Sequence, residues 1–297
     1  MSALAAVSNP ASEARMVDGE FAMTDADFRK IAAMLHGDAG IALPENKATL
    51  VYSRLAKRLR TLGLSSFKDY CALVAGSDGL VERQKMLAAL TTNVTRFYRE
   101  PHHFDHLRDQ VLPPMLERAR AGGRVRLWSA ACSTGQEPYS AAITLLQAAP
   151  DATRLDIKIL ATDIDPNVVA EGRAGTYSQS AMAGVPDALR GRYFDRTDQR
   201  GDLAWRVNED VRSLVSFREL NLIGDWPMKG AFDVIFCRNV VIYFEEDTQS
   251  RVWSRFAPRL ATGGYLYIGH SERLTGPAVA GFSADGITTY RRTGVAL

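Results

Sequence analysis

The chain has 297 residues, of which 46% are hydrophobic and 24% are charged, the composition of an ordinary soluble protein with one large or two smaller domains. A net charge of +2 excludes a general electrostatic attraction to nucleic acid. No stretch approaches the roughly 20 apolar residues of a membrane span, and the first residues lack the pattern of a secretory signal, so we expect a cytoplasmic protein without membrane insertion.

The first part of the chain predicts helices. Residues 1–22 are rich in Ala and Ser and show little periodicity, so we expect a flexible tail there. From 23 to 90 the pattern is helical only: Thr24 precedes Asp27 by three residues, as at a helix start, and Gly63 can close a second helix. We therefore predict an N-terminal all-α domain.

After a linker or lid at residues 91–106, the pattern changes. Apolar runs alternate with helical segments over residues 107–297, which predicts a parallel sheet with helical crossovers. Residues 176–220 break this rhythm with three short β-rich pieces joined by polar turns, which we interpret as a small antiparallel β insertion. The fold class predicted is therefore α/β, preceded by a helical domain.

The first strand of this sheet ends in "WSAACSTGQEPYS", which has a single glycine, Gly135, and an acid, Glu137, at the start of the next helix. A carboxylate at that point repels phosphate, which argues against NAD, FAD or a P-loop nucleotide. Asp163 ends the second strand, where an acid commonly binds ribose hydroxyls. S-adenosylmethionine is a ribose-bearing cation without phosphate, so these residues favour it as the ligand. Alternatively, Glu137 complements a helix dipole and Asp163 caps the next helix.

Six segments in order, "TTNVTRFYREPHHF", "WSAACSTGQEPYS", "ATDID", "NL", "FCRNVVIYF" and "GHSE", resemble the CheR-type chemotaxis receptor methyltransferases over about residues 24–292. Those enzymes transfer methyl from S-adenosylmethionine to glutamate side chains of bacterial chemoreceptors. The resemblance implies a Rossmann-like S-adenosylmethionine methyltransferase sheet with the β insertion. It also implies a partner, the cytoplasmic helices of methyl-accepting chemotaxis receptors.

The resemblance also implies site residues. The expected cofactor-binding residues are Asn93, Thr95, Arg99, Glu137, Asp163, Asn221, Leu222, Arg238 and Asn239. Arg99 and Tyr243 match the family's catalytic region. A glutamate acceptor is already ionised near neutral pH, so we expect placement and desolvation rather than proton transfer. Arg99 can orient either the acceptor carboxylate or that of the cofactor, and Tyr243 can add a donor.

The segment "TTNVTRFYRE", residues 91–100, is interpreted as a cofactor lid between the domains, the alternative being an ordinary linker with capped helix ends. His102, His103 and His106 follow it at possible helical spacing, but no second segment supplies further ligands, so no metal site is expected. His270 in "GHSE" has either a structural or a catalytic role. The cysteines lack disulfide or zinc-ligand spacing, and those near the cofactor motifs are expected to be small apolar fillers.

Two features concern the acceptor protein. Arg54, Lys57 and Arg58 lie within one turn of the second helix, which is either a solvated face or a docking surface for glutamate-rich receptor helices. In some family members the β insertion grips a receptor tail peptide with a Gly-x-Gly turn. Here "RTDQRGDLAW" has only Gly201, so binding of a tethered pentapeptide is doubtful.

The sequence is less compatible with two other functions. A non-catalytic, cofactor-binding sensing or docking module of the same family is disfavoured because the motif residues are intact. A methyltransferase for RNA or a small metabolite is a third possibility. Near-neutral charge and the lack of aromatic-rich basic stretches argue against nucleic acid.

Overall fold

The computed structural model describes residues 15–17, 19–199 and 201–294, and it divides into two compact units. The first unit extends to Asp38 and also contains Ala42–Leu90, whereas the second contains Ala39–Ile41 and the chain from Thr91 onward. Within the described ranges, no helix is long and apolar enough to cross a lipid bilayer.

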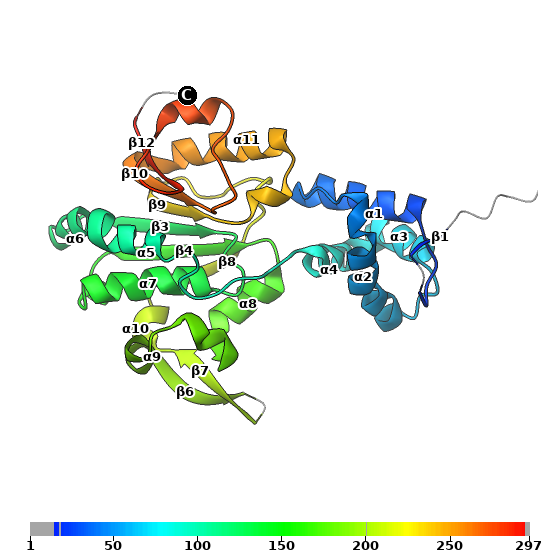
Figure 1. Cartoon of the computed structure of the whole chain (residues 1–297), viewed down its shortest axis with the longest axis horizontal. Helices are drawn as coiled ribbons and strands as arrows, with labels where there is room; N and C mark the ends of the chain where they lie inside the picture. Colours follow the sequence, from blue (N-terminus) through cyan, green and yellow to red (C-terminus); the bar gives the residue numbers. More distant parts are fainter. Residues whose placement is uncertain (1–14, 18, 200, 295–297) are drawn as a thin grey trace, which may run out of the picture. The chain divides into compact units, whose positions relative to one another are not determined.

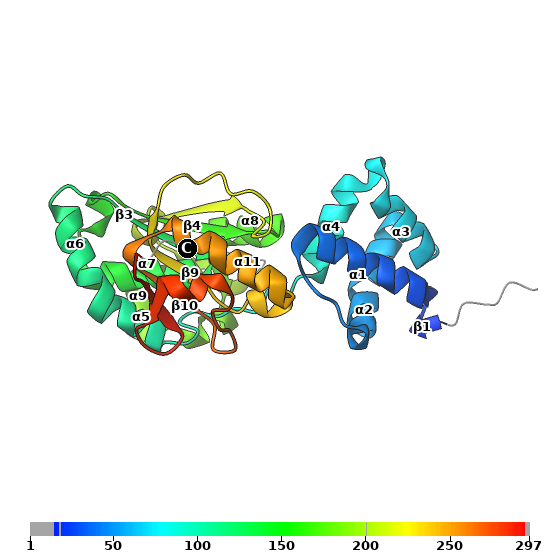
Figure 2. The same ribbon diagram turned by 90° about the horizontal axis from the view of Figure 1, so that it is seen from above.

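The first unit is built from α1 (Asp25–Ala39), α2 (Ala48–Leu62), α3 (Phe67–Ala75) and α4 (Leu80–Leu90) (Figures 1 and 2). The predicted helix ends at Thr24 and Gly63 are confirmed. Thr24 Oγ1 accepts a hydrogen bond from the Asp27 N–H at 3.2 Å, and the Asp27 carboxylate accepts one from the Thr24 N–H at 3.1 Å. Gly63 ends α2 with φ 67°, the left-handed conformation that glycine adopts without steric cost.

The prediction of a flexible tail was wrong for the residues after position 14 that the structure describes. β1 (Arg15–Val17) pairs antiparallel with β2 (Met23–Thr24). Phe21 is buried, and its N–H donates to Tyr52 Oη at 3.0 Å. Strands of two or three residues are too short to show periodicity, so sequence patterns did not predict them. The rest of the predicted tail, residues 1–14 and 18, lies outside the described residues.

A seven-stranded sheet organises the second unit, in the order β11–β12–β10–β9–β3–β4–β8. β10, β9, β3, β4 and β8 run parallel, and β12 and β11 extend one edge antiparallel. The strands are β3 (Val125–Ala130), β4 (Ile157–Asp163), β8 (Val215–Glu219), β9 (Phe232–Cys237), β10 (Leu260–Ile268), β11 (Phe282–Ala284) and β12 (Thr289–Arg292). This sheet confirms the predicted α/β class.

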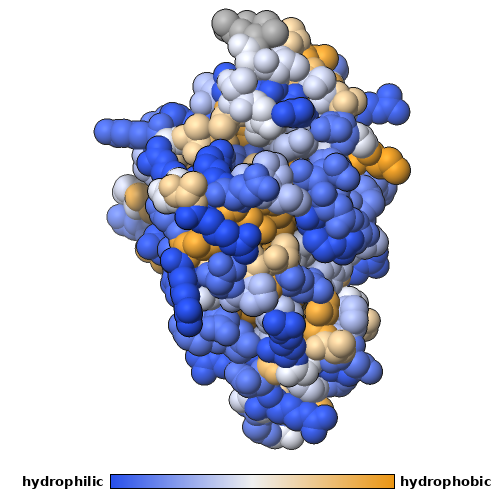
Figure 3. All heavy atoms as spheres, turned by 90° about the vertical axis from the view of Figure 1, so that its left-hand side faces the viewer, coloured by the Kyte–Doolittle hydropathy of each residue, from blue (hydrophilic) through white to orange (hydrophobic). Residues whose placement is uncertain are grey.

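Helices cover both faces of the sheet. They are α5 (His102–His106), α6 (Leu112–Arg120), α7 (Gln136–Ala148), α8 (Pro166–Ala174), α10 (Glu209–Arg212) and α11 (Glu246–Phe256). The remaining helix, α9 (Asp187–Tyr193), packs on the β insertion. Figure 1 shows α7 and α11 on opposite faces. Consecutive side chains of β3 reach both cores, because Leu127 packs in the cluster that contains α7 and Trp128 in the one that contains α11. The face in Figure 3 is mostly hydrophilic with small apolar patches, as is usual for a globular surface.

The β insertion exists, but its strands differ from those predicted. β5 (Thr176–Ser178), β6 (Phe194–Gln199) and β7 (Asp202–Val207) form an antiparallel sheet in the order β5–β7–β6. The third piece expected there is β8, which instead pairs parallel with β4 in the main sheet. That assignment was wrong because a short strand's composition does not show which sheet it joins.

Candidate functional site

The predicted site residues of the second unit gather at the carboxyl ends of the parallel strands or in the segment before them. Asp163 is the last residue of β4, and Arg238 and Asn239 directly follow β9. β3, at the centre, is flanked by β4 on one side and by β9 on the other. The chain leaves β3 toward β4 and returns later on the opposite side, so the strand order reverses there. Open α/β sheets bind ligands at such a point.

The loop between β3 and α7 has an unusual backbone. Ala131, Ser133 and Gly135 all have positive φ, at 62°, 50° and 96°. At Gly135 a Cβ atom would lie 3.0 Å from Gly172 Cα and 3.0 Å from Tyr177 Oη. Glycine is therefore required at this position by both conformation and packing. The tight loop lets backbone N–H groups point toward the end of β4.

Asp163 accepts one N–H group from the β3–α7 loop and one from the loop that follows β4. Its Oδ2 accepts from the Ser133 N–H at 2.8 Å, and its Oδ1 accepts from the Asp165 N–H at 3.0 Å. The side chain is buried, and burial raises the pKa of its carboxyl above the ordinary value. Each oxygen has a second lone pair, so the carboxylate can accept further hydrogen bonds from a diol.

Glu137 is the second carboxylate of the site, and 11% of its side chain is exposed. Its Oε1 accepts from Ser129 Oγ at 2.7 Å, and its Oε2 lies 3.1 Å from Nη1 of Arg238. Burial raises the pKa of Glu137, although Arg238 and Ser129 oppose that effect. The arginine is itself buried and also binds Glu100, with Nη2 3.3 Å from Oε2, and the carbonyl of Arg99. One guanidinium thus joins segments far apart in the sequence.

Glu100 is the centre of a second group of contacts. Burial opposes its ionisation, but Arg238 and His270 outweigh burial and lower its pKa to about 2. His270 Nδ1 lies 3.0 Å from Oε1 of Glu100. Nδ1 of the buried His103 lies 3.6 Å from Oε2, and burial lowers the pKa of His103 to about 3. These contacts give His270 a structural partner that its place in "GHSE" did not reveal.

The histidines after the lid segment come together differently from the prediction. Glu100, His102 and His103 each place one potential ligand atom within 4.8 Å of the others, but all three belong to one short segment of the chain. The guanidinium of Arg238 lies 3.3 Å from the same carboxylate oxygen and repels any metal cation there. His106 instead bonds Tyr267 Oη at 2.9 Å.

The segment from Thr91 to Glu100 lies against the β3–α7 loop within the second unit. Asn93 Nδ2 donates to Asp165 Oδ2 at 3.0 Å, and the Asn93 carbonyl accepts from Ser133 Oγ at 2.9 Å. Phe97 is buried, with its ring centroid 4.9 Å from that of Tyr177. Arg99 Nη1 donates to the Val94 carbonyl at 3.0 Å. The polar residues of this segment therefore touch the loop that holds Asp163.

The remaining predicted residues lie around this group. Thr95 is partly buried, and Asn221 follows β8 with its Oδ1 accepting from the Ile223 N–H at 3.1 Å. Leu222 is buried in the core on the α11 side. Tyr243 is partly buried at the end of a 3₁₀ turn, Val241–Tyr243, beyond β9.

Hydrogen bonds arrange six of the predicted residues in two groups. Asn93 and Asp163 are connected through Ser133 and Asp165. In the other group Arg238 binds Glu137, Glu100 and the Arg99 carbonyl, and Asn239 binds Glu100.

The basic residues of α2 differ in their contacts within the first unit. Arg58 forms a two-bond ion pair with Glu82, with distances of 2.8 and 2.6 Å. Arg54 Nη1 donates to the Leu90 carbonyl at 2.9 Å. Lys57 is exposed. Two of the three predicted docking residues thus hold α2 against α4, and Lys57 is the member whose side chain faces solvent.

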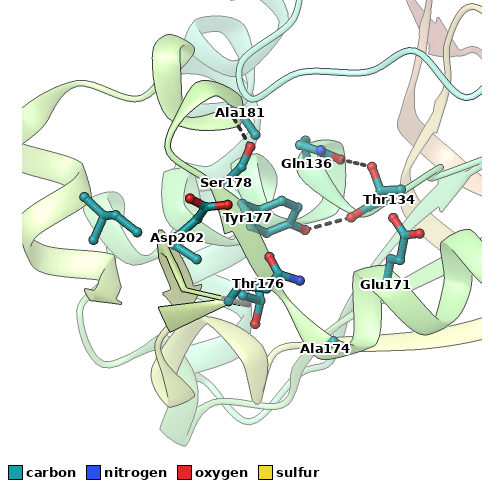
Figure 4. Close-up of a pocket in the computed structure, with 12 residues that line it drawn as sticks. Thr134, Gln136, Glu171, Ala174, Thr176, Tyr177, Ser178, Ala181 and Asp202 are labelled. Atoms are coloured by element: carbon teal, nitrogen blue, oxygen red, sulfur yellow. Dashed lines mark hydrogen bonds between the residues drawn. The ribbon is translucent and has the colours of Figure 1, made fainter. Parts of the chain in front are cut away.

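A cavity of about 650 Å³ lies on another side of the β3–α7 loop (Figure 4). Thr134 and Gln136 line it from the loop and α7, and Tyr177 lines it from the β insertion. Tyr177 Oη donates to the Thr134 carbonyl at 2.7 Å, a bond that ties the insertion to the loop. None of the predicted cofactor-binding residues is in its lining, so this cavity is separate from the residues at the carboxyl ends of the strands.

Sequence reasoning missed Glu272 and Glu100. The first is the last residue of "GHSE" and the second belongs to the "RE" pair, so both stand in motifs that the sequence offered. Their buried positions were the missing information, because a carboxylate buried beside a predicted site is bonded to something.

The fold, with Asp163 and Glu137 beside the central strand, defines a Rossmann-like methyltransferase domain. The family described as "CheR methyltransferase, SAM binding domain" matches residues 93–289, and "CheR methyltransferase, all-alpha domain" matches residues 26–91. The chain belongs to this CheR methyltransferase family, and its cofactor is S-adenosylmethionine.

Curated relatives cover most of the chain. A probable chemotaxis protein methyltransferase of Rhizobium etli is 57% identical over 260 residues, which span 88% of this chain and 97% of that protein. Chemotaxis protein methyltransferase 2 of Pseudomonas aeruginosa is 44% identical, over 86% of this chain and 89% of that protein. The chemotaxis protein methyltransferase of Escherichia coli is 40% identical, over 86% of both chains.

Proposed function

We propose that this protein transfers a methyl group from S-adenosylmethionine to glutamate side chains of chemoreceptors, forming glutamyl methyl esters in bacterial chemotaxis. The observation that carries the proposal is a pair of carboxylates in a chain of the CheR family: the buried Asp163 at the end of β4 and the nearly buried Glu137 in the first turn of α7. The names of the relatives support a role in chemotaxis. That role corresponds to an enzyme acting in the cytoplasm.

The residues of the site fit a cationic nucleoside. Asp163 has lone pairs left for ribose hydroxyls, and Glu137 carries negative charge at the start of α7, where a phosphate would be repelled. Burial raises the pKa of both carboxyls, so a nearby cation stabilises their ionised forms. We assign Asn93, Thr95, Asn221, Leu222 and Asn239 to the walls of the same site.

S-adenosylmethionine, when bound, supplies an electrophilic methyl group. The acceptor carboxylate is ionised at neutral pH, with an ordinary pKa of about 4.3, so the protein has no proton to remove. Its task is to hold the acceptor in line and to exclude water. We assign this orienting role to Arg99, whose planar guanidinium can bind a carboxylate with two parallel bonds, and to Tyr243. Neither residue acts as a nucleophile.

The acceptor would be a helical surface rich in glutamate, and the basic flank of α2 is the proposed docking element. Lys57 is its exposed member, whereas Arg54 and Arg58 also brace the first unit. The turn between β6 and β7 has Gly201 and no Gly-x-Gly. We therefore propose that the enzyme recognises receptor helices without a tethered tail peptide; micromolar binding of such a peptide in calorimetry would contradict this.

Methyl transfer tests the proposal directly. Purified protein and labelled S-adenosylmethionine should place label on receptors in receptor-rich membranes, and mild base should release it as methanol. Esters hydrolyse under those conditions, whereas methyl groups on amines or rings do not. A protein that binds S-adenosylhomocysteine but transfers no base-labile label would be the non-catalytic module instead.

A further inference from the structure

The loop after β9 presents three consecutive backbone N–H groups to one point. Asn239 has φ 59°, a left-handed conformation that is rare outside glycine. It turns the chain so that its own N–H and those of Val240 and Val241 converge. Consecutive N–H groups in such a turn form a concavity that binds an anion.

The anion in this concavity is the side chain of Glu272. Its Oε1 accepts from the N–H groups of Val240 at 2.8 Å and Val241 at 3.0 Å. Its Oε2 accepts from those of Asn239 at 2.9 Å and Gly269 at 2.5 Å. Only 4% of Glu272 is exposed, so water cannot replace these bonds. One carboxylate thus fastens the loop after β9 to the loop after β10.

Packing reinforces the same attachment. A Cβ atom on Gly269 would lie 2.4 Å from Asn239 Nδ2 and 2.7 Å from the Asn239 backbone nitrogen. Gly269 therefore lets the β10 loop approach Asn239 more closely than any other residue would. The bonds from Glu272 and the contact from Gly269 act on the same residue from the same side.

We propose that Glu272 is a positioning residue, whose carboxylate fixes the loop that presents Asn239 to the cofactor and begins the turn carrying Tyr243. The inference rests on the proposed role of Asn239 at the cofactor and on that of Tyr243 in methyl transfer. Val241, bound to Glu272, is the first residue of the 3₁₀ turn that ends at Tyr243. Loss of the carboxylate moves both residues without removing either from the chain.

The substitution Glu272→Gln removes hydrogen bonds of the carboxylate without changing the size of the side chain. Glutamine has nearly the same size, but one of its terminal atoms is an NH₂ group that faces either Val240 and Val241 or Asn239 and Gly269. Two of the four N–H groups then lose their acceptor, whichever way the amide is oriented. We expect S-adenosylhomocysteine to bind about tenfold more weakly by calorimetry. The kcat for methyl transfer should also fall, because a displaced Tyr243 affects transfer and not only binding.

Asp233 provides the matched control. It is buried near the amino end of β9, the strand that leads into the loop bound by Glu272. Its Oδ2 accepts from the Arg126 N–H at 2.8 Å, and its Oδ1 binds Arg118. Asp233→Asn should lower stability, as Glu272→Gln does, but leave S-adenosylhomocysteine affinity within about twofold of the wild type. Equal losses of affinity in the two folded variants, or unchanged affinity in Glu272→Gln, would overturn the inference.

Two further variants keep the test decisive. If Glu272→Gln fails to fold, Gly269→Ala takes its place, because this variant keeps the carboxylate of Glu272 and displaces Asn239. Wild-type affinity of Gly269→Ala for S-adenosylhomocysteine overturns the inference. Asn239→Ala should weaken binding in parallel. Weak binding by Asn239→Ala with normal binding by Glu272→Gln removes the positioning role and leaves the cofactor site intact. Calorimetry needs no acceptor, so failure to methylate receptors does not affect this result.

Discussion

Nη1 of Arg238 lies 3.1 Å from Oε2 of Glu137, and both side chains are almost excluded from solvent. The same guanidinium also binds Glu100, so a single positive charge balances two carboxylates that are each only 11% exposed. Removing one partner of a buried ion pair lowers stability much more than removing one partner of an exposed pair. The reason is that the remaining buried charge is left without compensation.

We therefore expect Arg238→Ala to lower the free energy of unfolding by about 3–5 kcal/mol, measured by urea denaturation. Arg120 gives the control, since its ion pair with Asp151 is about half exposed at 3.1 Å. Arg120→Ala should change stability much less, because water and salt screen an exposed pair. Similar losses in the two variants would show that Arg238 is not the electrostatic centre of the site.

Asp163 is expected to contribute to cofactor binding through the lone pairs that its two backbone bonds leave free. Asp163→Ala should weaken S-adenosylhomocysteine binding by about tenfold to a hundredfold, the range for hydrogen bonds to a charged group. Asp156 is the control, an exposed carboxylate before the amino end of β4 that pairs with Arg126 at 2.7 Å. Asp156→Ala should bind like the wild type. Equal affinities for all three proteins in calorimetry would exclude a ribose contact at Asp163.

The sequence predicted the parallel sheet, the helix ends at Thr24 and Gly63, and the position of Asp163 after a strand, because each depends on local patterns. Periodicity identifies a strand, and topology then brings strand ends together. The partners of Arg238 could not be predicted in this way. Glu100 and Glu137 are more than a hundred positions away in the sequence, and no local pattern connects them to Arg238.

The same reason explains the errors. The segment of β8 resembles the strands of the insertion in composition, and only its pairing with β4 assigns it to the main sheet. Arg58 appeared to be part of a basic face, but its partner Glu82 lies on another helix. Charge along one helix predicts a surface only where no acid from a neighbouring helix reaches it.

His103 should make stability depend on pH. Burial, reinforced by Arg238, lowers its pKa to about 3 from an ordinary value near 6.5. Between those values the unfolded chain binds a proton at this residue and the folded protein does not, so stability falls as pH decreases from 6.5. The full effect of one such proton is about 1.4 kcal/mol per pH unit.

Urea denaturation of the wild type and His103→Gln at several pH values measures this contribution. The variant should lose stability less steeply with acidification between pH 6.5 and 4.5. Below about 4.5 Glu100 adds a further loss, since its folded pKa of about 2 lies under its ordinary value. Above pH 7.5 the two proteins should show the same slope, which serves as an internal control. Parallel curves over the whole range would mean that His103 is protonated in the folded state.

Lys57 is the cleanest probe of receptor docking, because its side chain is exposed and Arg58 is bound to Glu82. Lys57→Glu should slow methylation of receptor-rich membranes severalfold, since it places a negative charge against a glutamate-rich surface, and the loss should shrink as salt is added. S-adenosylhomocysteine affinity should stay unchanged because the substitution lies in the first unit.

Lys68→Glu, which changes an exposed lysine on α3, is the charge-matched control and should methylate receptors at the wild-type rate. Arg58→Glu would be uninformative here, because it sets two acids against each other and destabilises the helices. If Lys57→Glu and Lys68→Glu lose the same activity, the effect is one of net charge and the α2 flank is not the docking surface.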